Sequence, residues 1–239
     1  MFVFDEPVDS VVCIFAHPAD AEVSAGATIA RFAASGASVV IATVCRGDKG
    51  ALVATDPTVT AQRRFAEAEQ SATRLGARWI SLGYDDGLRW GDDRLDERLV
   101  ELVRECRPQV VITSDPLVVY VGSSHINHRD HRVVGQAAVD AVGSFAPNPN
   151  YFPGAGAPWV TRWILLSAAH SPNCVVDAQG FLESKTAALA CHVTQLGGGE
   201  VDDTSMSSVS GFVNARAVSD AAASSVQLGE AFFAIGPAS

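Results

Sequence analysis

Short apolar runs alternate with amphipathic stretches along the first two thirds of the chain. Unbroken runs rich in Val and Ile are typical of strands buried on both faces, and the amphipathic stretches have the spacing of helices, the first two of which end at a glycine. The strands are predicted over 11–16, 38–45, 78–83, 109–115 and 162–168, and the helices over 23–36, 58–76, 94–106 and 130–142. Strict alternation of the two predicts an α/β fold with a mostly parallel, doubly wound sheet and helices on both faces.

Two loop-like segments, 116–127 and the Pro/Gly-rich 145–158, interrupt this alternation without the composition of a domain linker. The chain shows no internal repeat, so we expect a single domain over residues 1–239. In and just after the second segment, Tyr151, Phe152 and Trp159 allow two interpretations. They form either an aromatic rim that grips an apolar or sugar face, or a packed surface loop.

Composition narrows the classes of partner. The formal net charge of −10 has no offsetting Lys/Arg cluster, which argues against nucleic acid and anionic membrane surfaces. No apolar run approaches the roughly 18 to 20 residues that span a bilayer, and the N-terminus has no signal-peptide pattern. The five cysteines are scattered without disulfide or zinc-knuckle spacing, so we expect a reduced, cytoplasmic protein whose cysteines bind no metal.

Polar clusters follow each of the first four predicted strands. They read HPADAE, CRGDKG, GYDDG and SDP, and the last leads toward HINHRDHR. Because the carboxyl ends of parallel strands share one edge of the sheet, and ligands gather there in open α/β sheets, the four clusters predict one site.

Two of these clusters carry metal-ligand residues. In HRDH, His128 and His131 stand about one turn apart at a predicted helix start with Asp130 between them, and HPAD supplies His17 and Asp20. Catalytic zinc sites use three protein ligands of this kind and leave a position for water, so His17 and Asp20 with one remote histidine would suffice. The alternatives are structural, since Asp20 and Asp130 also suit a helix N-terminus.

Together these motifs resemble the LmbE/PIG-L-like family of zinc-dependent N-deacetylases, which act on N-acetylglucosamine-type substrates. The similarity rests on HPADAE with GATIA, CRGDKG, RPQVVITSDP, HRDHRVVGQAA, KTAALACHVTQ and GEAFFAI, in order over nearly the whole chain. It implies a Rossmann-like sheet that holds one Zn²⁺ through His17, Asp20 and His131.

The resemblance also implies roles for other residues. His128 matches the histidine that stabilises the oxyanion or protonates the leaving amine, and Asp130 matches the carboxylate that orients it. Arg46 and Asp86 fall where family members contact sugar hydroxyls. The implied substrate is a small-molecule N-acyl amino sugar or glycoconjugate, with homo-oligomerisation left open.

Ala19 departs from the family pattern, which has an aspartate there as the general base for the metal-bound water. Since the neighbouring ligands are intact, we expect an impaired enzyme, and the isolated loss favours a deliberately inactivated variant over a natural pseudoenzyme. The sequence leaves both origins open. Glu22 is a poor substitute base, because two residues along a helix it faces about 200° away from Asp20, and we expect it to be solvated or to interact with the helix dipole.

The leading interpretation is therefore hydrolysis of an N-acyl amide of an amino sugar. An inert homologue that binds zinc and sugar without turnover is the alternative, and Ala19 is its basis. The sequence has no GxGxxG after the first strand, which argues against a dinucleotide-dependent oxidoreductase. It also has no GxSxG elbow, which argues against a serine hydrolase.

Overall fold

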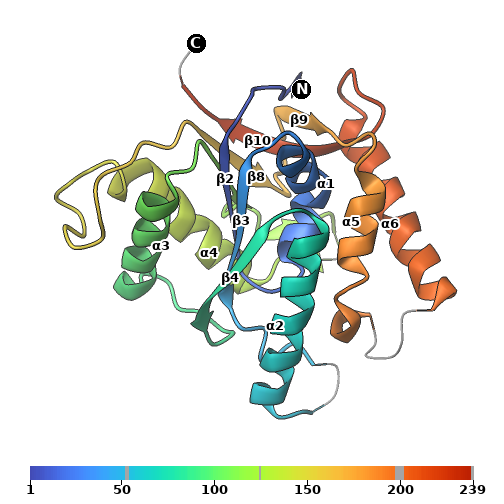
Figure 1. Ribbon diagram of the computed structural model, residues 1–239, viewed down its shortest axis with the longest axis horizontal. Coiled ribbons are helices and arrows are strands. Elements are labelled where there is room, and N and C mark those ends of the chain that lie inside the picture. Colours follow the sequence, from blue (N-terminus) through green and yellow to red (C-terminus); the bar gives the residue numbers. More distant parts are fainter. Residues whose placement is uncertain (52–53, 124, 197–201, 238–239) are drawn as a thin grey trace.

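The computed structural model describes residues 1–51, 54–123, 125–196 and 202–237, and its centre is an eight-stranded sheet (Figure 1). The strand order is β1-β9-β10-β8-β5-β2-β3-β4. The strands are β1 (Phe2–Val3), β2 (Ser10–Phe15), β3 (Ser38–Cys45), β4 (Arg78–Tyr84), β5 (Val110–Ser114), β8 (Trp163–Ser167), β9 (Cys174–Asp177) and β10 (Gly229–Ile235). Within the described residues of this sheet, only β10 pairs antiparallel, with β8 and β9, so the expected mostly parallel sheet is confirmed.

The central strands are hydrophobic on both faces because helices cover both faces. In the register, Cys13 of β2 lies between Ile41 of β3 and Ile112 of β5, and all three side chains are buried. Alternate residues of β2 enter separate hydrophobic cores. Val12 and Ile14 belong to one core, whereas Cys13 and the residues two positions before and after it belong to the other. A strand buried in this way has no polar face, which explains its continuous apolar run.

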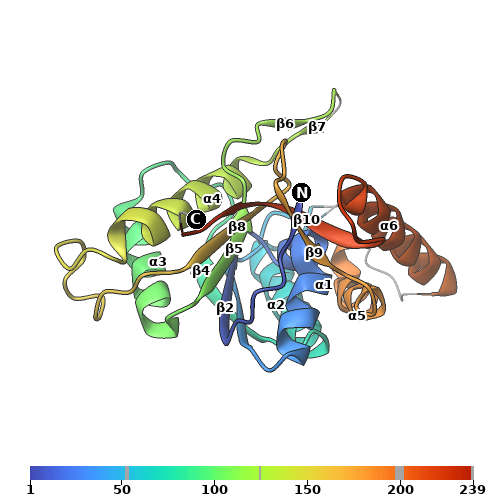
Figure 2. The same cartoon turned by 90° about the horizontal axis from the view of Figure 1, so that it is seen from above.

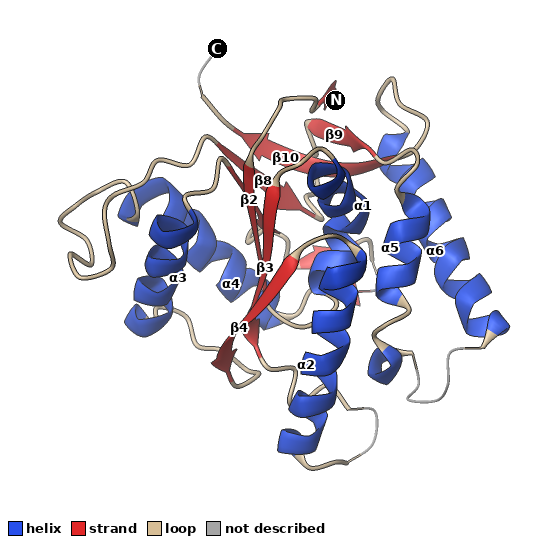
Figure 3. Cartoon of the chain, in the orientation of Figure 1, coloured by secondary structure: helices blue, strands red, loops and turns tan. Residues whose placement is uncertain are grey.

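In the part of the chain that the structure describes, four α-helices lie on one side of the sheet and two on the other (Figures 1 and 3). The first group is α1 (Asp20–Ala34), α2 (Pro57–Arg74), α5 (Leu182–Leu189) and α6 (Asp203–Ala221), of which α6 packs on α5 and β10. The second group is α3 (Asp93–Cys106) and α4 (Arg129–Asp140), which continues into a π-helical turn, η1 (Ala141–Phe145). The doubly wound arrangement is therefore confirmed.

The elements predicted from periodicity are all present, and their ends shift by a few residues at most. The prediction had no elements after residue 168, where the structure has β9, α5, the short η2 (Val193–Gln195), α6 and β10. Segment 116–127 was expected to be a loop, yet β6 (Tyr120–Val121) and β7 (His125–Ile126) form an antiparallel hairpin that projects from the body (Figure 2).

Segment 145–158 packs as a surface loop against α3. The buried guanidinium of Arg104 donates hydrogen bonds to six main-chain carbonyl groups between residues 145 and 156. The Trp159 indole donates to the Pro108 carbonyl at 2.9 Å, just before β5 begins. These contacts lie at the amino ends of the strands, so the interpretation as a sugar-gripping rim was wrong and the packed-loop alternative is correct.

The strand order reverses at the centre of the sheet, where β2 lies between β3 and β5. The chain moves outward from β2 to β3 and β4 on one side, and to β5 and β8 on the other. The loops that leave the carboxyl ends of β2 and β5 therefore diverge and leave a crevice, which is where open α/β sheets bind ligands. Among the described residues, no helix is both long and apolar enough to cross a membrane.

Candidate active site

The loop between β2 and α1 places His17 and Asp20 at the carboxyl edge of the sheet. Its main chain is fixed locally, because the His17 N–H donates to Asp20 Oδ2 at 2.8 Å. Between them Ala19 has φ 89° and ψ −21°, a left-handed conformation, and its carbonyl accepts the first helical hydrogen bond, from Val23. Alanine adopts this region at a cost, whereas Asp and Asn tolerate it better.

The start of α4 supplies the other two histidines. His128 is the N-cap, and its Nδ1 accepts a hydrogen bond from the Asp130 N–H at 3.2 Å. His131 lies one turn along, and its ring is 29% exposed, against 55% for the ring of His128. Asp130, in the first turn of α4, is fully buried. A carboxylate there also suits the positive end of the helix dipole.

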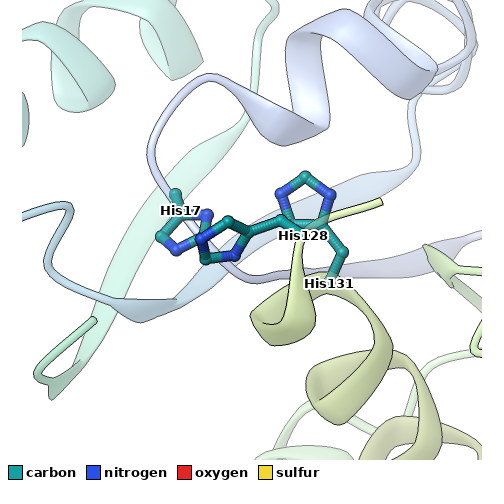
Figure 4. A group of neighbouring side chains, drawn as sticks. All are labelled: His17, His128 and His131. Carbon is teal, nitrogen blue, oxygen red and sulfur yellow. The ribbon is translucent and has the colours of Figure 1, made fainter. Parts of the chain in front are cut away.

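These two segments meet in space (Figure 4). Asp20 Oδ2 lies 3.3 Å from His17 Nδ1 and 3.1 Å from His131 Nε2. One ring nitrogen each of His17, His128 and His131 lies within 4.8 Å of the others, close enough to share a metal ion. The structure thus brings together every residue of the HPAD and HRDH motifs that was expected to bind metal.

Asp130 has different partners from those expected. Its carboxylate accepts hydrogen bonds from the Gly87 and Leu88 N–H groups at 2.7 and 2.9 Å, and its Oδ2 lies 3.2 Å from His17 Nε2. His128 Nδ1 is farther, at 3.8 Å, beyond hydrogen-bond distance. The side chain of Asp130 therefore orients His17, whereas only its main-chain N–H contacts His128.

The close packing of carboxylates and imidazoles changes their acidity. Although burial acts in the opposite direction, the hydrogen bonds with Asp130 and Asp20 raise the pKa of His17 to about 12. Burial likewise opposes the shift at Asp130, where His17 and the Gly87 N–H lower the pKa to about 2. The charge of His131 holds the pKa of Asp20 well below its usual range against its burial. Burial and the nearby charge of His17 lower the pKa of His128.

Arg46 and Asp86, the expected sugar contacts, lie in two loops bound to each other. The Asp86 carboxylate accepts from the Gly47 and Lys49 N–H groups at 2.8 and 3.0 Å, and its Oδ1 is 4.0 Å from His17 Nε2. The Arg46 guanidinium is paired with Asp85 and is 35% exposed. Asp86 thus borders the cluster but already uses its oxygens within the protein, and Arg46 is bound to the neighbouring Asp85.

Arg64 was missed by the sequence analysis, although it holds the same region together. It is 4% exposed and donates to the carbonyl groups of Gly47, at 3.0 Å, and Pro18, at 3.4 Å. A buried arginine joins the loop after β2 to the loop after β3. Arg64 lies beside other polar residues in the predicted helix 58–76, so the sequence did not indicate that its side chain is buried between two loops.

The donor set of the cluster fits zinc, which binds histidine nitrogen and carboxylate oxygen in tetrahedral sites. Cys45 also enters the site, since His17, Cys45 and Asp86 form a second group whose ligand atoms lie within 4.8 Å of one another. The sequence placed no cysteine in either motif, so this contact was unforeseen. Burial raises the pKa of the Cys45 thiol to about 11, which favours a neutral thiol over a thiolate. All five cysteines are free.

Glu22 is buried instead of solvated. It is 2% exposed, accepts a hydrogen bond from Ser71 Oγ at 2.6 Å, and lies 3.3 Å from His192 Nε2. His192 comes from the KTAALACHVTQ segment, to which no role was given. The expectation of a solvated or dipole role for Glu22 is wrong, because α2 and the segment after α5 cover that face of α1.

Comparison with known proteins finds relatives that match most of the chain. Residues 12–142 match the family model PIG-L, described as GlcNAc-PI de-N-acetylase. The chain is 33% identical over 211 residues to a diacetylchitobiose deacetylase of Thermococcus kodakarensis, covering 81% of this chain and 74% of the relative. It is 28% identical over 245 residues to a 1D-myo-inositol 2-acetamido-2-deoxy-alpha-D-glucopyranoside deacetylase of Rhodococcus erythropolis, covering 78% and 81%.

Solved structures share the fold. The N,N'-diacetylchitobiose deacetylase of Pyrococcus horikoshii, solved with an inhibitor, superposes with a TM-score of 0.83 at 26% identity and covers 96% of this chain and 84% of its own. A 4-carboxy-2-hydroxymuconate hydratase of Pseudomonas putida has a TM-score of 0.75 at 20% identity, over 97% and 98%. The second similarity shows the fold alone, since one fold supports several chemistries.

Proposed function

The chain belongs to the PIG-L family of GlcNAc-PI de-N-acetylases, and on that premise we propose that it is a zinc-dependent N-deacetylase. Its substrate is an amino sugar or amino-sugar conjugate whose N-acyl group, normally acetyl, is hydrolysed to the free amine. Relatives named for diacetylchitobiose and for a glucosaminyl-inositol support this substrate class. We treat residues 1–239 as one LmbE-like deacetylase domain.

The observation that carries the proposal is the meeting of HPAD and HRDH at the switch point of the sheet. We assign His17, Asp20 and His131 as zinc ligands, because the Asp20 carboxylate lies within 3.3 Å of both imidazoles. When bound there, zinc would polarise the amide carbonyl and make water acidic enough to attack it. Asp130 fixes the ring of His17 through Nε2, which leaves Nδ1 directed to the Asp20 side.

His128 is assigned to the reacting amide. Its ring is 55% exposed, which leaves it accessible to a substrate, and its centroid is 5.0 Å from that of His17. From this position it would donate a proton or a hydrogen bond to the developing oxyanion and the leaving nitrogen. Arg46 and Asp86 are proposed to contact sugar hydroxyls, with the half-exposed guanidinium of Arg46 the more available of the two.

Ala19 makes this form a poor catalyst. The methyl group replaces the carboxylate that the family uses to take a proton from water, and loss of a general base removes about two to four powers of ten in rate. The left-handed backbone at residue 19 is one that aspartate readily adopts. This conformation is consistent with an inactivated variant in which the rest of the site is intact.

Ala19 also supports a second candidate, a homologue that binds zinc and sugar without turnover. The two candidates differ in what a restored carboxylate does. In the deacetylase, Ala19→Asp reinstates the missing step. In a binding protein that has evolved other features, it changes nothing in turnover.

The deciding experiment measures released amine from N-acetylglucosamine, diacetylchitobiose and glucosaminyl-inositol amides with the zinc-loaded chain and its Ala19→Asp variant. A gain of about 10² to 10⁴ in rate is expected, with substrate binding little changed. Ala19→Asn is the matched control, since it keeps the size and the backbone preference but supplies no base. Equal and measurable rates for all three proteins would contradict the assigned mechanism, whereas no detectable turnover in any of them would favour the binding protein.

Five free cysteines fit a reducing compartment, and we propose that the chain acts in the cytoplasm on a small-molecule substrate.

A further inference from the structure

A cavity of about 330 Å³ opens beside the histidine cluster, between α1, η2 and α6. Asp20 is the residue that the cavity and the cluster share, and Ala19 forms the adjoining part of its wall. A water molecule takes about 30 Å³ of liquid volume, and a methylene group is of similar size. The cavity is therefore larger than the single methyl group of an acetyl amide requires.

The lining of this cavity is mainly apolar. Six of the ten lining residues are apolar: Ala19, Val23, Leu189, Leu196, Val209 and Phe212. Leu189 and Val209 belong to a hydrophobic cluster that anchors α5 to α6, whereas Leu196 and Phe212 are 38% and 49% exposed. Large apolar side chains left in water around a concave site indicate a ligand of the same character.

Within the described ranges, the cavity has four polar lining residues, Asp20, His192, Gln195 and Ser208, and three of them face other groups of the protein, which leaves Gln195 as the one polar side chain free to meet a ligand. Asp20 turns its carboxylate to His17 and His131, and Ser208 Oγ donates to the Thr204 carbonyl at 2.9 Å. His192 is 1% exposed and lies 3.3 Å from Glu22. A ligand that enters the cavity thus meets mainly hydrocarbon.

A second cavity, of about 660 Å³, borders the cluster through Gly87 and Leu88, whose N–H groups hold Asp130. Its lining is rich in charge, with Asp85, Arg89 and Asp92 among its residues, and it shares no residue with the apolar cavity. An N-acyl amino sugar has the same division, because hydroxyl groups lie on one side of the amide and a hydrocarbon chain on the other.

We propose that the apolar cavity is an acyl-chain subsite and that the substrates of this chain include amides of acyl groups longer than acetyl. The inference rests on the proposed amide hydrolysis and names the acyl half of its substrate. Ala19 contributes a buried methyl group to the lining next to Asp20.

The test is calorimetric binding of N-acetyl-, N-butanoyl- and N-hexanoyl-glucosamine to the zinc-loaded full chain, with amine release followed in parallel. Burial of hydrocarbon should lower the Kd about twofold to fourfold for each added methylene, so hexanoyl should bind more than about tenfold more tightly than acetyl. Phe212→Ser should flatten the series. Val23→Phe should fill the cavity and weaken hexanoyl while sparing acetyl.

Val218→Ser is the matched control, since Val218 is 57% exposed on the same helix and does not line the cavity. It should leave the series unchanged. Equal Kd values for all three amides would overturn the subsite and leave the proposed function standing. A steep series that Phe212→Ser and Val23→Phe leave intact would mean that the acyl group binds elsewhere, and this result would also overturn the proposed subsite. If no amide binds, the proposed function fails and the subsite fails with it.

Discussion

Asp20 Oδ2 lies 3.1 Å from His131 Nε2, which joins the first residue of α1 to the first turn of α4. The same oxygen accepts a hydrogen bond from the His17 N–H and lies 3.3 Å from the His17 ring. One carboxylate therefore connects two segments that are far apart in the sequence. Without a metal, the negative charge of the Asp20 carboxylate faces both imidazole rings. With a metal ion bound, His17, Asp20 and His131 would each supply one ligand.

Substitution of these ligands should abolish metal binding. Asp20→Asn and His131→Ala are each expected to lower zinc affinity by more than the roughly 10- to 100-fold that loss of an outer partner costs. The measurement is zinc content after dialysis against a weak chelator. His125→Ala is the control, because His125 is an exposed residue of β7 outside the cluster.

The role of His128 distinguishes two ligand sets. If His17, Asp20 and His131 hold the metal, His128→Ala keeps its zinc, and in the Ala19→Asp background its kcat falls by about two or more powers of ten. Steady-state kinetics and metal analysis of the same preparation check this prediction. Loss of zinc together with kcat would instead assign the metal to the three histidine nitrogens.

Backbone strain at residue 19 should be measurable in stability. Ala19 has φ 89°, and since the left-handed region costs a non-glycine residue about 1–2 kcal/mol, Ala19→Gly should raise the free energy of unfolding by about 1 kcal/mol. Ala33→Gly, in the helical part of α1 that follows the kink at Ala25, is the control and should lower it by about 1 kcal/mol. Urea denaturation of the three proteins gives the values. A destabilised Ala19→Gly would show that the alanine methyl contributes more by packing than its backbone costs.

The stability of the metal-free protein should depend on pH in a defined direction. The pKa of His17 is raised to about 12, so its contribution is present below the ordinary value of 6.5 and is lost as the pH rises toward 12. The pKa of Asp130 is lowered to about 2, so its contribution is present above the ordinary value of 3.8 and is lost as the pH falls toward 2. These two groups therefore favour the folded state most between about pH 4 and 6.5.

Urea denaturation in the presence of a chelator at pH 5, 7 and 9 checks this expectation. The free energy of unfolding should fall from pH 7 to pH 9, and Asp130→Asn should reduce the fall, because it removes a hydrogen-bond partner of His17. The same decline in both proteins would mean that other groups set the pH dependence.

Much of the fold could be predicted from the sequence. Strands buried on both faces leave continuous apolar runs, and β3 begins and ends at the residues expected. The C-terminal third was not predicted, because α6 combines scattered small and polar residues and packs mainly on α5 and β10, so its sequence carries little periodicity. The hairpin of β6 and β7 consists of two-residue strands, too short for any alternation to show.

The sequence by itself indicated the candidate metal ligands, because HPAD and HRDH carry metal-ligand residue types at local spacings. It also determined that residue 19 lacks a carboxylate. Only the tertiary structure decided which groups touch. It directed the Asp130 carboxylate to His17 instead of His128, brought Cys45 to the site, and buried Glu22 against His192. The physical reason is that a strand end or helix start fixes a side chain's position within its own segment, whereas its partners depend on the register and packing of segments distant in the chain.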